Sequence, residues 1–190
     1  MEITSAIFKR GVVGDNDILE DGTPQIAFIG RSNAGKSSLL NSLTRSKKLA
    51  ITSKTPGRTK EINVFLINDT HHFLDLPGYG YAKAGGGALK KLSQLIYWYL
   101  FRSAHNPVVV LLIDSVVGPT KDDLGILGEL EKTGKDIIIV ANKVDKIKKS
   151  QYRNQLKKLE DQLPGHHIVP YSSKTGIGIQ ELTDLLLETE

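Results

Sequence analysis

The sequence predicts a three-layer α/β fold, in which a mostly parallel sheet with one antiparallel strand carries helices on both faces. Short apolar runs of strand length alternate with segments of helical spacing along most of the chain, a pattern typical of parallel strands joined by helices. Two of the runs are separated only by a tight turn, which indicates an antiparallel pair. The chain has 190 residues, enough for a substantial core, and we expect one domain over residues 1–190.

The N-terminal part of the chain predicts an extension that leads into the first core strand. Apolar residues alternate within 3–13, which favours an edge strand or hairpin, so we expect residues 1–24 to pack on the sheet edge. Further along, the segment Arg45–Lys60 is polar and basic. Its Pro56-Gly57 pair favours a loop over a continuous helix.

The middle of the chain predicts a hairpin and then a glycine-rich loop. Ile62–Ile67 and His71–Leu74 are short apolar runs joined at Asn68-Asp69, a dipeptide typical of hairpin turns. Residues 79–87 contain many glycines and are expected to form a loop before the next helix. The expected strands are 25–29, 62–67, 71–74, 108–113, 137–141 and 167–170, and the expected helices are about 36–46, 88–102, 121–133, 149–163 and 178–188.

Composition excludes several classes of protein. Without cysteine the chain forms no disulfide, thiolate zinc site or thiol nucleophile. The N-terminus lacks a basic region followed by a long apolar core, so it does not resemble a signal peptide. The longest apolar runs are too short to span a membrane. We therefore expect a cytoplasmic protein that does not associate with membranes.

Basic residues are concentrated in one part of the chain. Residues 22–113 hold twelve Lys/Arg and three Asp/Glu, whereas the remainder holds thirteen and eighteen. No acidic residue occurs between Leu76 and Ile113. This surplus favours a basic face that binds a phosphate backbone; a solvated surface without a partner is the alternative.

The stretch GRSNAGKS, Gly30–Ser37, has the G-x-x-x-x-G-K-[ST] spacing of a nucleotide phosphate loop between a strand and a helix. Two glycines let successive backbone N–H groups point into one concavity at a helix N-terminus. The lysine would reach the β- and γ-phosphates, and the hydroxyl of Ser37 would ligate Mg²⁺. The expected phosphate-binding residues are Gly30, Arg31, Ser32, Asn33, Ala34, Gly35, Lys36, Ser37 and Ser38.

A second motif, Asp75-Leu76-Pro77-Gly78, follows the second hairpin strand, 38 residues past Ser37. The Asp75 carboxylate can hold Mg²⁺ through its water shell, and the Gly78 backbone N–H can meet a γ-phosphate. Alone, D-x-x-G is as typical of a turn at a strand end. Its distance from the phosphate loop favours the functional interpretation.

Two motifs near the C-terminus predict guanine as the base. The carboxylate of Asp145, in Asn142-Lys143-Val144-Asp145, can accept hydrogen bonds from both N1–H and the 2-amino group of guanine. Adenine would leave that carboxylate unpaired. Lys143 can lie over the base and brace the loop. In Ser172-Ser173-Lys174, the Ser173 backbone N–H is expected at guanine O6.

The ordered set GKS, DLPG, NKVD and SSK resembles that of translation-factor-class P-loop GTPases of the Ras-like fold. More narrowly, GRSNAGKSSLLNSL, TSKTPGRTKEINVF and DLPGYGYA resemble the EngB group of bacterial ribosome-assembly GTPases, over residues 5–188. The resemblance implies GTP hydrolysis to GDP with Mg²⁺. It also implies a role in maturing the large ribosomal subunit, with its rRNA as partner, and a linked requirement for cell division and septation.

The resemblance also assigns residues in the segment after the first helix. Thr59 matches the threonine whose hydroxyl completes the Mg²⁺ shell, with Thr55 as the alternative. Gly57 and Arg58 are expected beside it at the nucleotide. Arg58 either acts as an arginine finger in cis or contacts a partner or solvent.

Catalysis is expected to depart from the Ras-like pattern. Those enzymes carry glutamine directly after the D-x-x-G glycine to orient water, but this chain has Tyr79, so intrinsic hydrolysis should be slow. Asn33 matches the asparagine that coordinates K⁺ in potassium-stimulated GTPases; alternatively, it only permits a tight turn. The residues expected to act in catalysis are Lys36, Thr59, Gly78 and Asn33.

Two further segments are candidates for RNA contact. Tyr97, Trp98, Tyr99 and Phe101 follow two lysines and either pack in the core or form a stacking surface. The basic residues Lys149, Arg153 and Lys157 recur every four residues on one face of the expected helix, which either is a solvated face or contacts rRNA.

We expect a monomeric GTPase switch that docks on a precursor of the large subunit in its GTP form. Two other classes compete with this interpretation. The first is a P-loop kinase or ATPase, against which the NKVD and SSK motifs argue. The second is a GTPase that regulates division machinery directly, without ribosome contact.

Overall fold

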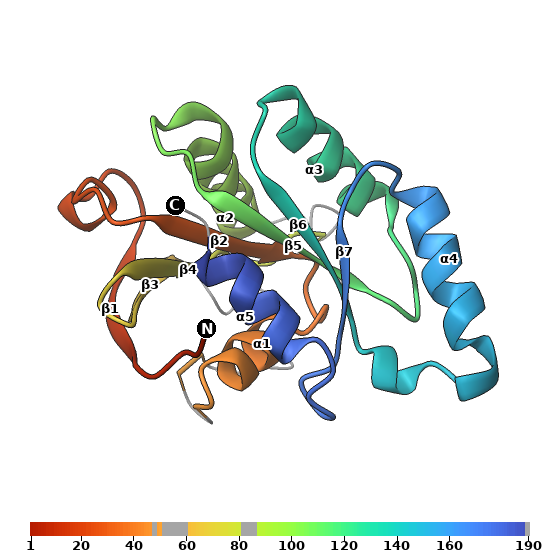
Figure 1. Cartoon of the computed structure of the whole chain (residues 1–190). Helices are drawn as coiled ribbons and strands as arrows, with labels where there is room; N and C mark the ends of the chain where they lie inside the picture. The colour runs from red at the N-terminus through yellow and green to blue at the C-terminus, as the bar shows by residue number, and fades with distance from the viewer. Residues whose placement is uncertain (47–48, 51–60, 81–86, 189–190) are drawn as a thin grey trace.

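The computed structural model describes residues 1–46, 49–50, 61–80 and 87–188, and these residues form a three-layer α/β fold (Figure 1). Seven strands make one sheet in the order β1-β3-β4-β2-β5-β6-β7. Their bounds are β1 (Ala6–Val12), β2 (Gln25–Gly30), β3 (Ile62–Ile67), β4 (His71–Asp75), β5 (Val108–Asp114), β6 (Ile137–Asn142) and β7 (Ile168–Tyr171). Strand β3 is antiparallel to both of its neighbours, and every other pairing is parallel. The predicted fold class is therefore confirmed.

Helices cover both faces of this sheet (Figure 1). The described helices are α1 (Lys36–Leu43), α2 (Gly87–Tyr97), α3 (Lys121–Lys132), α4 (Tyr152–Gln162) and α5 (Ile179–Leu187), with short helical turns η1 (Asp17–Leu19), η2 (Trp98–Arg102), η3 (Val144–Lys146) and η4 (Lys149–Gln151). On one face, α1 and α5 pack through Leu40 and Leu186 against sheet residues such as Phe28. On the other face, α2, η2 and α3 pack through residues such as Tyr99 and Leu130.

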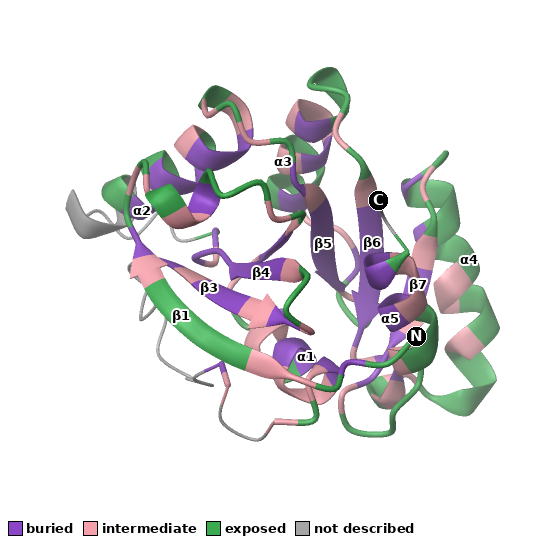
Figure 2. Cartoon of the chain, turned by 60° about the vertical axis from the view of Figure 1, so that its left-hand side comes forward, coloured by how far each residue is buried: buried purple, intermediate pink, exposed green. Residues whose placement is uncertain are grey.

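The buried residues lie between these layers, and the outer helix surfaces are exposed (Figure 2). Strands β2, β5 and β6 are buried almost throughout because helices cover both of their faces. Within the described segments, no helix is long and apolar enough to cross a membrane.

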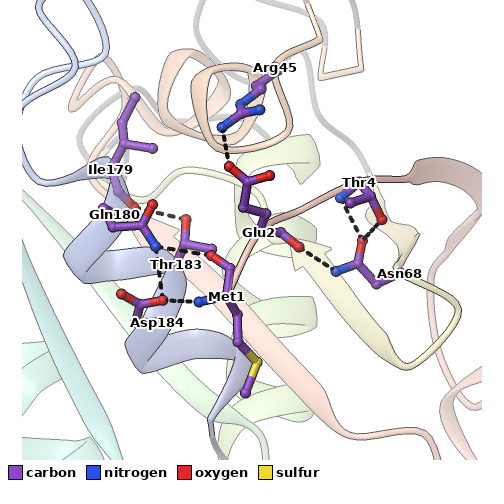
Figure 3. A network of polar contacts seen from close by, with 9 residues as sticks. All are labelled: Met1, Glu2, Thr4, Arg45, Asn68, Ile179, Gln180, Thr183 and Asp184. Atoms are coloured by element: carbon purple, nitrogen blue, oxygen red, sulfur yellow. Dashed lines mark hydrogen bonds and ion pairs between the residues drawn. The ribbon is translucent and has the colours of Figure 1, made fainter.

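The N-terminal segment lies along the sheet edge, where β1 pairs with β3. Asn68, in the turn between β3 and β4, adopts a φ of 50° and uses its side chain to fix this segment (Figure 3). Its Oδ1 accepts hydrogen bonds from the Thr4 and Ser5 backbone N–H groups at 2.8 and 3.1 Å, and its Nδ2 donates to the Glu2 carbonyl at 2.8 Å. The turn asparagine thus supports the hairpin and also anchors the chain that crosses it.

The same segment also reaches two helices (Figure 3). Glu2 pairs with Arg45, just beyond the end of α1, at 3.1 Å. The Met1 amino group pairs with Asp184 of α5, and the Met1 carbonyl accepts a hydrogen bond from Gln180 at 3.0 Å. Residues 1–5 therefore connect α1, α5 and the β3–β4 turn.

The continuous helix expected over 88–102 is wrong in its last turn. The α-helix ends at Tyr97, and Trp98–Arg102 form a π-helical turn, in which the Ser103 N–H donates to the Trp98 carbonyl at 2.8 Å. Tyr99 is fully buried inside this turn and donates its hydroxyl hydrogen to Gln25 at 2.6 Å. The wider turn places this large ring in the core beside the buried Leu100, while Trp98 and Phe101 are only partly buried.

The first helix is shorter than expected, because it ends at Leu43 rather than near residue 46. The Thr44 hydroxyl donates to the Leu40 carbonyl at 2.8 Å, and Arg45 adopts a left-handed φ of 51°. A side chain that bonds to the last turn and a left-handed residue after it are both typical of a helix end.

Candidate functional site

The motifs picked out from the sequence converge at one edge of the sheet. The phosphate loop follows β2, Asp75 ends β4, Asn142 ends β6, and Ser172 follows β7. These strands are parallel, so their carboxyl ends meet at the same edge, where ligands bind in open α/β sheets. The site is therefore built by neighbouring strand ends rather than by one continuous segment.

The loop between β2 and α1 turns through two left-handed residues, Asn33 with φ 67° and Gly35 with φ 101°. The Ala34 N–H donates to the Arg31 carbonyl at 2.9 Å, which closes the turn. Gly35 is the residue before α1, and Lys36, Ser37 and Ser38 form the first turn of that helix. The helix N-terminus therefore faces the loop, and its N–H groups and dipole favour an anion there.

Asn142 fixes the phosphate loop from the neighbouring strand end. Its side chain is buried, and its Nδ2 donates to the Ala34 carbonyl at 2.8 Å. A Cβ on Gly35 would overlap this Nδ2, so only glycine fits between the loop and Asn142. Gly30 is also confined, because a Cβ there would lie 3.0 Å from the Leu112 carbonyl oxygen.

Lys36 and Asp75 form an ion pair in which both side chains are largely buried. The pair brings the phosphate-loop ammonium next to the carboxylate at the end of β4. Ser37 is the next residue on α1, so a hydroxyl and a carboxylate lie in the same part of the site. Hydroxyl and carboxylate oxygens are ligands that suit Mg²⁺, which also takes phosphate oxygens and waters.

The chain after β4 pairs directly with the phosphate loop. The Ser32 N–H donates to the Tyr79 carbonyl at 3.1 Å, and the Tyr79 N–H donates to the Gly30 carbonyl at 3.3 Å. A Cβ on Gly78 would lie 3.2 Å from the Ser32 Cα. The absence of a side chain at Gly78 therefore lets the two loops approach.

The side chain of Tyr79 contacts α3. Its hydroxyl donates to Asp123 Oδ1 at 2.5 Å, and both residues are buried. The other oxygen of Asp123 accepts hydrogen bonds from the Thr120 N–H and hydroxyl, each at 2.7 Å, which completes the N-terminal cap of α3. Burial and the nearby Asp123 carboxylate raise the pKa of Tyr79 well above its usual range, so the hydroxyl remains a donor.

The residues expected to recognise the base lie together on the other side of the loop. The buried Ser172 hydroxyl donates to Asp145 Oδ1 at 2.6 Å and accepts hydrogen bonds from the Lys174 and Thr175 N–H groups at 3.3 and 3.2 Å. Ser173 lies in the loop between Ser172 and these two donor residues and is half-buried. The serine hydroxyl thereby fixes one oxygen of the carboxylate and the shape of the loop.

Lys143 connects this part of the site to the phosphate loop. It adopts a left-handed φ of 66°, and its Nζ donates to the Asn33 carbonyl. The same Nζ pairs with Asp114, at the end of β5, at 2.7 Å. The ammonium is therefore held between two strand ends and the phosphate loop.

Three contributors to the site were missed in the sequence. Asp114 ends a buried strand just as Asp75 does, and this position at a strand end could have predicted that Asp114 contributes to the site. The pair Thr120 and Asp123 forms a capping box, which can be read from a threonine followed three residues later by an acid. The contact of Asp123 with Tyr79 depends on how α3 packs and leaves no local sequence signal.

Four expected site residues, Thr55, Gly57, Arg58 and Thr59, lie outside the described residues. Asn33 lies within the described residues and is exposed on the loop, where its carbonyl accepts a hydrogen bond from Lys143 Nζ. Among the described residues, no cluster of three or more His, Cys, Asp or Glu side chains is arranged to hold a metal ion. A metal at this site would depend on Ser37 and Asp75 together with oxygens of the nucleotide.

Sequence comparisons match the chain to GTPases. Residues 25–143 match a family described as 50S ribosome-binding GTPase, and residues 103–190 match the elongation factor Tu GTP-binding domain. The chain is 43% identical over 183 residues to a probable GTP-binding protein EngB of Chlorobaculum tepidum, covering 96% of this chain and 95% of the relative. It is 42% identical over 189 residues to the Clostridium kluyveri protein of that name, covering 98% and 96%.

Solved structures agree with these matches. A crystal structure of a probable GTP-binding protein EngB superposes with a TM-score of 0.70 at 25% identity, covering 86% of this chain and 97% of that one. Era in complex with MgGDPNP and nucleotides 1506–1542 of 16S ribosomal RNA gives a TM-score of 0.70 at 28% identity, covering 87% and 56%.

The protein is a P-loop GTPase. Its glycine-rich loop lies between β2 and α1 at the edge of a mostly parallel sheet, and the sequence and structure matches are to GTPases. The protein binds GTP and hydrolyses it. Its near full-length similarity to the bacterial relatives places it further: the chain belongs to the EngB family of GTP-binding proteins.

Proposed function

We propose that this GTPase is a switch in the assembly of the large ribosomal subunit, with a linked requirement for cell division and septation. The observation that carries the proposal is the match of residues 25–143 to a family described as 50S ribosome-binding GTPase. The basic surplus of residues 22–113 supports it, because rRNA presents a dense array of phosphates. Era, a structural neighbour, has been crystallised with a ribosomal RNA fragment.

In this proposal the phosphate loop binds the triphosphate. The loop N–H groups from Gly30 to Ser38 surround the phosphates, and Lys36 leaves its pair with Asp75 to bind the β- and γ-phosphates. The Lys36 ammonium is already largely buried, so replacing its carboxylate partner with a phosphate costs little additional desolvation free energy. Gly78 donates its N–H to the γ-phosphate and so links the phosphate to the chain that follows β4.

Mg²⁺ is the proposed cofactor, held by Ser37 directly and by Asp75 through water, with Thr59 completing the shell in the GTP form. The donor set consists of hard oxygen atoms, which suits this ion. Bound Mg²⁺ would neutralise charge on the β- and γ-phosphates during hydrolysis. The segment with Gly57, Arg58 and Thr59 would then sense whether the γ-phosphate is present.

Guanine is proposed to bind between Asn142, Lys143 and the loop of Ser172, Ser173 and Lys174. The free oxygen lone pairs of Asp145 accept the N1–H and 2-amino hydrogens, while the hydrogen bond from Ser172 keeps the carboxylate oriented. The aliphatic part of Lys143 covers the base. An ATP-specific kinase or ATPase would leave this carboxylate unpaired and buried against adenine, at a cost of about 1–3 kcal/mol.

Hydrolysis is proposed to be slow until the protein meets its partner. The residue after Gly78 is Tyr79, whose hydroxyl is bound to Asp123 of α3. It therefore does not orient a water molecule at the γ-phosphate. K⁺ coordinated by Asn33, or the large subunit itself, would supply the missing positive charge or positioning.

Cosedimentation with purified large subunits tests the proposed partner. The GTP-analogue form should pellet with the subunits, the GDP form should pellet less, and binding should fall as salt rises because phosphate contacts release counterions. The alternative is a GTPase that acts on division machinery without ribosome contact. Failure to pellet at low salt in either nucleotide form would contradict our proposal and favour that alternative.

A further inference from the structure

A groove that the nucleotide site does not use runs along α2 and η2. A cavity of about 450 Å³ lies between α2 and the chain that follows β1, lined by residues that include Val13, Asp15, Lys91 and Trp98. A second cavity of about 510 Å³ continues along the helix and is lined by Ser93, Gln94, Tyr97, Trp98 and Arg102. Trp98 and Gln94 line both cavities. Volumes of about 300–1,000 Å³ are typical of small-ligand sites.

The π-helical turn shapes the second cavity. It brings Arg102 over the ring of the residue five positions earlier, Tyr97, with the guanidinium carbon 5.6 Å from the ring centroid. The Phe101 ring also packs against Tyr97, with centroids 4.9 Å apart. Tyr97 is nevertheless 44% exposed. The turn therefore holds a large aromatic ring at the surface in a fixed orientation, and π-turns often occur at functional sites.

The charge of this groove is basic. Lys91 and Arg102 are exposed, whereas Asp15 is the acid among the cavity-lining residues. The sequence carries no acidic residue from Leu76 to Ile113, so α2 and η2 contribute only positive charge. A partner that complements the groove combines anionic groups with flat rings that stack on aromatic side chains.

We propose that the α2–η2 groove, defined by Lys91, Gln94, Tyr97, Trp98 and Arg102, binds unpaired bases of single-stranded RNA. Bases stack on the Tyr97 and Trp98 rings, Gln94 offers an amide to base edges, and Lys91 and Arg102 contact the phosphates. Stacking platforms flanked by cations are the usual means of binding single strands. The choice of RNA over other single strands rests on the proposed ribosomal function.

This groove is separate from the nucleotide site, which lies at the carboxyl ends of the strands. It lies on α2 and η2, the helical segments that follow the D-x-x-G motif in the chain. RNA bound in this groove would contact the GTPase at a second site, away from the nucleotide. Among the aromatic residues of this helix, Tyr99 is buried in the core, so the platform consists of Tyr97 and Trp98.

Trp98 is the only tryptophan in the chain, and its fluorescence therefore reports directly on the groove. We would titrate the GTP-analogue form with a twelve-nucleotide oligoadenylate RNA and follow both Trp98 quenching and the anisotropy of a labelled strand. We expect quenching that saturates, and much weaker binding of an abasic strand of the same length. Equal binding of the abasic strand would overturn the proposal, because phosphates alone would explain it.

Substitutions then assign the binding to named side chains. Tyr97→Ala should weaken binding about 5- to 150-fold, the range expected for one lost base stack, and Tyr97→Phe should restore it. Arg102→Ala should weaken binding and reduce the salt slope by about one. Phe8→Ala and Lys158→Ala are the controls, since Phe8 is 51% exposed on β1 and Lys158 is exposed on α4, both outside the groove. Wild-type affinity in Tyr97→Ala would overturn the proposal.

Cosedimentation with large subunits separates this inference from the proposed function. If the wild-type protein pellets and Tyr97→Ala pellets equally well, the groove inference fails while the ribosomal function stands. If the wild-type protein does not pellet but binds oligoadenylate through Tyr97, the groove stands and the ribosomal function fails. If Tyr97→Ala loses the subunits while the wild type ignores the RNA strand, the occupant is a protein and the inference is wrong.

Discussion

Asn142 connects the two halves of the nucleotide site through a single side chain. Its Nδ2 binds the Ala34 carbonyl in the phosphate loop, and its Oδ1 accepts a hydrogen bond from the Lys143 N–H at 2.8 Å. Because the side chain is buried, either hydrogen bond would cost about 1–3 kcal/mol to leave unmade. The first residue of the Asn142–Asp145 motif, for which we propose base recognition, therefore also holds the phosphate loop in place.

Gly35→Ala tests this close contact. A methyl group would overlap Asn142 Nδ2, and φ is 101°, so we expect a loss of about 1–3 kcal/mol in the free energy of unfolding. GDP affinity should fall as well, because the loop must move. Urea denaturation and fluorescent GDP titration measure both effects. Gly134→Ala is the matched control: φ there is also positive, at 64°, but the added methyl would meet no atom within 4 Å. Equal losses in the two variants would contradict the steric argument.

Asp145→Asn tests the proposed base recognition. An amide has one acceptor oxygen and one NH₂ donor, so it cannot pair with both the N1–H and the 2-amino group of guanine, but its NH₂ can donate to the carbonyl that xanthine carries in place of that amino group. We expect GDP to bind about 10- to 100-fold more weakly, which corresponds to a lost hydrogen bond to a charged group, and xanthosine diphosphate to bind more tightly. Competition titrations against fluorescent GDP measure both. An unchanged preference for guanine would show that Asp145 does not recognise the base.

At the scale of elements, the end of β4 is connected to the start of α3. Tyr79 follows Gly78 and gives its hydroxyl hydrogen to Asp123, the residue that also caps α3 through Thr120. This connection fixes the first residues after the D-x-x-G motif. Any change of that segment on GTP binding would therefore begin beyond Tyr79 or would involve breaking this buried hydrogen bond.

Tyr79→Phe tests the strength of the connection. The variant keeps the ring and removes only the hydroxyl, which leaves one carboxylate oxygen of Asp123 without this donor. We expect the free energy of unfolding to fall by about 1.5–3 kcal/mol, as for hydrogen bonds to charged groups. Tyr152→Phe on α4, where the hydroxyl has no hydrogen bond among the described residues, should change stability by less than about 0.5 kcal/mol. Equal effects would show that the Tyr79 contact contributes little.

Sequence reasoning located most elements and motifs but not their mutual contacts. Alternating runs and turn residues predicted the sheet with its one antiparallel strand, because periodicity and turn chemistry are local properties. The π-turn at Trp98–Arg102 was missed, since helical spacing alone does not distinguish an α- from a π-turn. The pairs Lys143–Asp114 and Tyr79–Asp123 depend on tertiary packing, so no short stretch of sequence contains both partners.

Across the whole molecule, one buried histidine makes stability depend on pH. His72 in β4 is 2% exposed, its Nδ1 is without a hydrogen-bond partner in the described structure, and its Nε2 lies 3.7 Å from Asp21. Burial lowers the pKa of His72 below its ordinary value of 6.5, partly opposed by the Asp21 carboxylate. The folded state therefore binds a proton at His72 less readily than the unfolded state does.

The sign of the pH effect follows from this difference. Below about pH 6.5 the unfolded chain binds more protons at His72 than the folded chain does. The stability that neutral His72 allows is therefore fully present above pH 6.5 and is lost as pH falls. We expect wild-type stability to fall relative to His72→Phe between pH 6.5 and 5, by at most about 1.4 kcal/mol per pH unit. Urea denaturation at each pH measures this. Parallel curves for the two proteins would contradict it.

The protein is a GTPase with Tyr79 in place of the water-orienting glutamine, and our central claim is that its hydrolysis depends on a partner or on K⁺. GTP turnover of the purified protein in NaCl and in KCl, each with and without large ribosomal subunits, tests this most directly. We predict a slow rate alone and strong stimulation by subunits, with any K⁺ stimulation lost in Asn33→Ala. A rate that neither K⁺ nor subunits changes would contradict the account.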